Sequence, residues 1–165
     1  MKLTSAPLFS CFLILNFVTY SLYGGESVSI KLEIEHALGK GVEWINSEQN
    51  NSSGQWGEAE YPALTALALR ATMGHPDLAV VQKYANQQAM GFSFILSKVQ
   101  SDGGIYGKGL ASYNTAICMM AMIQSKDPEY NDIIKSARRF LINQQSDFDR
   151  KGQRDNVFDG GVGYG

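Results

Sequence analysis

The stretch KGVEWINSEQNNSSGQWGEAEYPALTALALRA, residues 40–71, decides the fold of this chain. It joins a segment with helical periodicity, a polar loop that carries glycine and tryptophan, and a second segment that is almost entirely apolar. It can be placed over residues 90–121 without a gap, and the matched pairs are Gly41 with Gly91, Trp44 with Phe94, Gly54 with Gly104, Trp56 with Tyr106, and Thr65 with Thr115. The chain therefore contains an internal repeat, which is typical of a stacked architecture.

A third copy of the repeat begins near Ala137. The matched pairs are Ala137 with Gly91, Phe140 with Phe94, and Gln145 with Gln49. An insertion at roughly residues 147–158 follows, and then Asp-Gly-Gly-Val at 159–162 echoes Asp-Gly-Gly-Ile at 102–105. The sequence stops inside this motif, so we expect two full helical hairpins, the start of a third, and a longer whole protein.

Each copy predicts two kinds of helix. The outer kind is amphipathic, because its apolar residues recur at spacings of three and four, as at Ile30, Ile34, Ala37, Leu38, Val42 and Ile45. The inner kind, at residues 63–69 and 115–123, is apolar on all sides and should be buried on all sides when the repeats are complete. Because no inner helix follows the third outer helix in this sequence, we expect residues 63–69 and 115–123 to leave an apolar wall open to water here. Asp77 and Asp127 are predicted N-caps. We therefore expect an all-α fold with an outer and an inner layer.

The composition and the N-terminus limit the function classes. Hydrophobic residues make up 44% of the chain and charged residues 18%, which indicates a globular core. The net charge is -2, so the chain lacks the excess of positive charge that is typical of nucleic-acid-binding proteins. Lys2, an apolar run at residues 7–18 and the small residues that follow predict a signal peptide at 1–24 and a mature domain at 25–165. An uncleaved anchor or a buried helix are the alternatives for this segment.

The first copy also carries a motif: Lys40-Gly41, Trp44-Ile45, Gln49 and Gly54-Gln55-Trp56 at fixed spacings. It resembles the QW motif of the squalene and hopene cyclases, in the terpenoid cyclase and protein prenyltransferase superfamily, and the resemblance covers about residues 40–165. It implies an α/α toroid (α6/α6-barrel-like) built from helical hairpin repeats and incomplete in this chain. It implies structural roles for Gly41, Trp44, Gln49, Gly54, Trp56, Gly91, Phe94, Gly104, Tyr106, Phe140 and Gln145.

The motif residues suit such packing. Gly41 and Gly91 remove a side chain where an outer helix would approach its neighbour. The Gln49 amide can satisfy backbone groups at the end of a neighbouring helix. Trp56 offers a large flat face beside it.

The sequence offers little chemistry. Cyclases of this family protonate their substrate with an acidic DxDD motif, which would fall at residues 61–64 or 111–114, and neither window contains an acid. Tyr61, Tyr113 and Asn114 in these windows are candidate substrate-binding residues on the cavity side. The zinc ligands of the prenyltransferases are absent, so we expect no catalytic residue, metal or cofactor. Cys118 lies among apolar residues and is predicted to be a buried hydrophobe.

The leading interpretation is an exported, terpene-cyclase-like protein whose apolar cavity binds or converts an isoprenoid or another lipid. Were it an enzyme, it would be a cyclase (an isomerase) or prenyltransferase-like. The alternative is a non-enzymatic exported scaffold that uses the toroid repeats to bind a protein partner or further repeats of the same chain. Neither interpretation involves nucleic acid.

Overall fold

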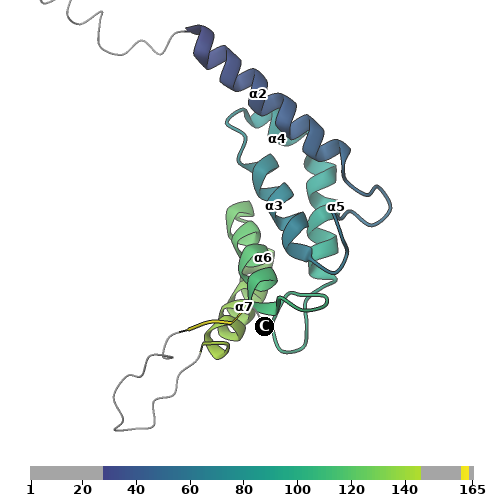
Figure 1. The fold of residues 1–165 in the computed structure, drawn as a ribbon, viewed down its shortest axis with the longest axis vertical. Coiled ribbons are helices and arrows are strands. Elements are labelled where there is room, and N and C mark those ends of the chain that lie inside the picture. The colour runs from purple at the N-terminus through teal and green to yellow at the C-terminus, as the bar shows by residue number, and fades with distance from the viewer. Residues whose placement is uncertain (1–27, 146–160, 164–165) are drawn as a thin grey trace, which may run out of the picture. The chain divides into compact units, whose positions relative to one another are not determined.

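The computed structural model describes residues 28–145 and 161–163, and helices make up 67% of these residues (Figure 1). In the described part no strands form, and only two isolated bridges occur, between Val99 and Ile105 and between Gln145 and Val162. The all-α prediction is confirmed. The chain divides into two compact units, Met1–Leu38 and Gly39–Gly165.

Outer and inner helices alternate along the described chain, as the repeat predicts. They are α2 (Val28–Ser47), α3 (Pro62–Met73), α4 (Leu78–Lys83), α5 (Ala85–Leu96), α6 (Ala111–Ser125), the 3-10 helix η1 (Pro128–Tyr130) and α7 (Asn131–Asn143). Helix α3 packs against α5 and α6, and α6 packs against α3 and α7. The two apolar helices α3 and α6 thus lie side by side at the centre of the second unit (Figure 1).

Both predicted N-caps form. The carboxylate of Asp77 accepts a hydrogen bond from Ala79 N at 2.8 Å, and that of Asp127 accepts one from Glu129 N at 2.9 Å. The second outer helix, however, is divided at Tyr84, which ends α4 and precedes α5. The division places the Tyr84 side chain in the core, where it is 8% exposed.

The core of the second unit joins the inner helices to α5, α7 and the two glycine-containing loops. Its buried members are Trp56, Ala66, Leu69, Phe92, Phe94, Ile95, Ile105, Cys118, Ala121, Met122 and Ala137. Within the described residues the inner helices are not buried on all sides, and part of their apolar surface is open to water, as expected for an incomplete set of repeats. Leu64 and Leu67 on α3 are 42% and 41% exposed, because no described element covers that side of the helix.

The first unit contributes residues 28–38 of α2. Apolar Ile30, Ile34 and Leu38 share one face and are 52%, 50% and 44% exposed. The predicted signal peptide at 1–24 and the predicted insertion at 147–158 lie outside the described residues. None of the helices in the described ranges is both long enough and apolar enough to cross a membrane.

Candidate functional site

The candidate site is a set of exposed apolar side chains on the two inner helices, which we name the inner strip. It consists of Leu64, Leu67, Tyr113, Met120 and Ile123, whose exposed fractions run from 40% for Tyr113 to 54% for Ile123. Each of these side chains sits on a helix whose opposite side is fully buried. The strip therefore presents hydrophobic surface that the folded unit does not use for its own core.

A polar clamp joins the two helices of the strip near their C-terminal ends. Arg70 Nε donates to Gln124 Oε1 at 3.1 Å, and Gln124 Nε2 donates to Arg70 O at 3.1 Å. Arg70 Nη1 also lies 3.9 Å from Met120 Sδ. These contacts fix α3 relative to α6, so the strip is a preformed surface.

The three residues predicted to bind substrate have different surroundings. Tyr61 is half-buried immediately before α3, and Tyr113 belongs to the inner strip. Asn114 is fully buried: its Oδ1 accepts from Ala63 N at 3.1 Å, and its Nδ2 donates to Gly109 O and Leu110 O. Contrary to the expectation, Asn114 ties the two windows together and has no surface to offer a ligand.

The motif residues Gln49 and Trp56 form the junction between successive hairpins. Gln49 Nε2 donates to Gly54 O at 2.8 Å and to Gln87 O at 2.9 Å, which joins the loop to the first turn of α5. Trp56 Nε1 donates to Ile45 O at 2.6 Å. Both side chains are 6% exposed, so their roles are structural.

The loop register predicted for the second copy is wrong by one residue. Trp56 N donates to Thr65 Oγ1 at 3.0 Å, and the equivalent donor to Thr115 Oγ1, at 2.8 Å, is Ile105 N and not Tyr106 N. Ile105 is fully buried, whereas the Tyr106 hydroxyl donates to Asp102 Oδ2 on the surface at 2.7 Å.

The glycines follow the same shift. Gly54 has a φ of +78° and its α-carbon lies against the backbone of Met90. Gly103, with a φ of +89°, lies in the same way against Ser136, one residue before the third copy's Ala137. Gly103 rather than Gly104 is therefore the counterpart of Gly54. The repeated Asp-Gly-Gly followed by an apolar residue, at 102–105 and 159–162, is the sequence signal that could have shown this.

Some of the remaining motif residues are packed in the core, and others are exposed to solvent. A Cβ on Gly91 would lie 2.9 Å from Trp56 Cζ3, whereas one on Gly41 would have nothing within 4 Å in the described part of the chain, so the close approach predicted at Gly41 stays a prediction. Phe94 and Phe140 are buried, and Trp44 is 65% exposed. Gln145 is exposed and forms its bridge with Val162, so it does not reproduce the buried Gln49.

The chemistry around the strip is sparse. Among the described residues, no group of three or more His, Cys, Asp or Glu side chains could hold a metal ion. Burial raises the pKa of the Cys118 thiol to about 12, so it is a protonated core residue at neutral pH. The hydrogen bond that the Tyr106 hydroxyl donates to Asp102 raises the pKa of Tyr106, with smaller contributions from burial and the Asp102 charge.

Comparison of the chain with known protein families gave no match. No curated protein matches it. No solved structure matches it either. The fold and the site define an all-α protein with a repeated helical hairpin, a hydrogen-bonded junction between the hairpins, and an exposed apolar strip on the inner helices.

Proposed function

We propose that this chain is part of a terpenoid-cyclase-like α/α toroid and that the inner strip binds an isoprenoid or another lipid chain. The observation that carries the proposal is the exposure of Leu67, Met120 and their neighbours on otherwise buried helices. Apolar surface of this kind is stabilised when it leaves water, by about 25 cal/mol per Å². Contiguous apolar patches on soluble proteins commonly mark a binding surface.

The proposed activity is binding and not cyclisation. Protonation of an alkene needs a carboxylic acid that burial and neighbours keep protonated. The strip contains no acid, and the two windows where the donor would stand hold Tyr61 and Tyr113. We expect no polycyclic product above a no-protein control when the chain is incubated with squalene or oxidosqualene and analysed by mass spectrometry.

Lipid binding can be tested with a fluorescent polyene fatty acid and with farnesol as a competitor. Met120→Gln and Leu67→Gln keep helix-forming side chains but place an amide in the strip, and we expect each to weaken binding about five- to tenfold. Leu78→Gln is the matched control, because Leu78 is 71% exposed on α4, outside the strip. Equal affinities in all three variants, or no saturable binding by the unmodified chain, would refute the proposal.

A second function, a scaffold that binds a protein partner or further repeats, is favoured by the way the repeat packs. The side of α3 that includes Ala63 and Arg70 contacts α6. A shift of 50 residues brings these positions to Tyr113 and Met120, which are 40% and 43% exposed on α6. The face that one inner helix buries against the next is thus uncovered on α6, and another helix of the same kind would suit it.

We also propose that the protein is exported. The apolar run at residues 7–18, preceded by Lys2 and followed by small residues, supports this proposal. N-terminal sequencing of secreted material should start between Leu22 and Glu26. Recovery of a cytoplasmic protein that retains Met1 would contradict it.

A further inference from the structure

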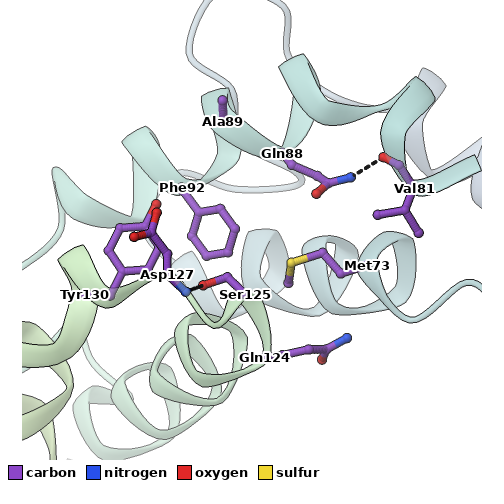
Figure 2. Close-up of a pocket in the computed structure, with 9 residues that line it drawn as sticks. All are labelled: Met73, Val81, Gln88, Ala89, Phe92, Gln124, Ser125, Asp127 and Tyr130. Atoms are coloured by element: carbon purple, nitrogen blue, oxygen red, sulfur yellow. Dashed lines mark hydrogen bonds between the residues drawn. The ribbon is translucent and has the colours of Figure 1, made fainter. Parts of the chain in front are cut away.

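A pocket of about 390 Å³ lies where α4, α5 and η1 meet the ends of α3 and α6 (Figure 2). Met73 is the last residue of α3 and Ser125 the last of α6, and both line the pocket. The C-terminal end of a helix carries a partial negative charge. Two such ends at one pocket favour a positively charged ligand.

One wall of the pocket is aromatic. The rings of Phe92 and Tyr130 stack with centroids 5.2 Å apart and an interplanar angle of 29°. Phe92 points into the centre of the pocket, and Tyr130 lies beside it together with Asp127 (Figure 2). Aromatic faces attract cations through their quadrupole, most strongly where water is partly excluded.

The polar groups of the pocket are mainly acceptors. Gln88 Nε2 donates to Val81 O at 2.8 Å, which leaves its amide oxygen as the acceptor turned toward the pocket (Figure 2). Ser125 Oγ already donates to Met122 O at 2.7 Å. Asp127 uses Oδ1 to cap η1 and contributes a carboxylate to the lining.

The charge of this lining is not balanced within the pocket. None of its nine residues is Lys, Arg or His, and Asp127 takes part in no salt bridge among the described residues. The pKa of the Tyr130 hydroxyl is raised, first by burial and then by the negative charges of Asp127 and Glu129. A carboxylate, an acceptor amide and an aromatic pair therefore surround one open space.

We propose that this pocket is a binding site for an alkylammonium cation. The cationic head lies between the Asp127 carboxylate and the Tyr130 and Phe92 rings, and the alkyl part lies against Met73. A neutral lipid chain would leave the Asp127 charge without a counter-ion in the pocket, and an anion would be repelled by it. The site is separate from the inner strip and does not depend on lipid binding there.

Choline is the probe, and its uncharged isostere, the alcohol in which a quaternary carbon replaces the nitrogen, is the control ligand. Both are titrated into the full chain and followed by NMR amide chemical shifts at Gln88, Phe92 and Tyr130. We expect saturable shifts with choline, weakened by added salt as a charge interaction should be, and at least fivefold weaker binding of the isostere. Equal binding of the two compounds, or no saturable shift with choline, would overturn the proposal.

Variants identify the groups responsible. Asp127→Asn removes the charge but keeps an N-cap side chain, so the fold should persist, and we expect choline affinity to fall at least fivefold while the isostere is unaffected. Asp77→Asn is the matched control, because Asp77 caps α4 in the same way and lies outside the pocket lining. Tyr130→Phe should retain binding and Tyr130→Leu should lose it. Unchanged choline binding in Asp127→Asn would place the cation elsewhere and refute the site.

Discussion

Trp56 stabilises the first repeat through three separate contacts. Its indole N–H donates to the end of α2 at Ile45 O, its backbone N–H donates to Thr65 on α3, and its ring lies against Gly91 on α5. Truncation would leave a cavity and would remove one of the two hydrogen bonds that Ile45 O accepts, the other coming from Glu48 N. We predict that Trp56→Ala lowers the free energy of unfolding by about 3–5 kcal/mol, measured by urea denaturation.

Trp44→Ala is the control for this prediction, because Trp44 belongs to the same motif but is 65% exposed. Its effect should stay within about 0.5 kcal/mol. Similar losses in both variants would mean that burial does not separate the roles of the two tryptophans.

The two motif glycines should respond oppositely to alanine. A methyl group at Gly91 would lie 2.9 Å from Trp56 and 3.0 Å from Leu69, so Gly91→Ala should cost roughly 1–3 kcal/mol. Gly41 lies in α2 with nothing within 4 Å of such a methyl, so Gly41→Ala should stabilise the protein by about 0.5–1 kcal/mol. Thermal melts of both variants check the prediction, and a destabilising Gly41→Ala would show that a neighbour covers this face.

The residues at the junction were partly predictable. The spacing of Gln49 and Trp56 was sufficient to predict two packed side chains, since an amide and an indole at the end of an outer helix need partners. The prediction for the second copy was wrong because, compared with the first copy, its loop is one residue shorter before Gly103 and one residue longer after it. These two changes cancel in an ungapped alignment, so Tyr106 occupied the place that belongs to Ile105.

Thr65 and Thr115 fix the loops to the inner helices. Each hydroxyl is fully buried and accepts a backbone N–H, from Trp56 and from Ile105. Thr115→Val keeps the shape but leaves Ile105 N without its acceptor, and we predict a loss of about 1–3 kcal/mol on chemical denaturation. Thr115→Ser should recover most of this stability, and an unchanged stability in Thr115→Val would contradict the loop register in which Ile105 is the counterpart of Trp56.

At the level of the helices, the sequence predicted segments and caps better than it predicted exposure. Periodicity and the acids at 77 and 127 located the helices, because both signals act within one or two turns. The division at Tyr84 was not foreseen, since it depends on the burial of one aromatic side chain by distant residues. The repeat pattern did predict an apolar wall open to water on the inner helices, but it did not predict which side chains would be exposed, because an apolar pattern indicates that a face avoids water and does not say what covers it.

In the molecule as a whole, the exposed apolar surface should govern behaviour in solution. The strip leaves Tyr113, Met120 and Ile123 on α6 at least 40% exposed, and α2 adds Ile30, Ile34 and Leu38 in the first unit. Soluble monomers rarely leave apolar patches of more than a few hundred Å² in water. We predict that the purified chain self-associates or binds a hydrophobic dye, measured by sedimentation velocity and dye titration.

Two matched variants distinguish self-association through the exposed face of α6 from nonspecific association through other exposed apolar residues. Ile123→Gln removes an apolar side chain that is 54% exposed on α6, and Ile142→Gln removes one that is 51% exposed on α7. If the inner helices carry the association, Ile123→Gln should shift the sedimentation profile toward monomer and reduce dye fluorescence, while Ile142→Gln should change neither. A monomer that melts sharply and binds no dye would show that the strip tolerates water, and the proposals that a lipid or another helix covers it would lose their physical basis.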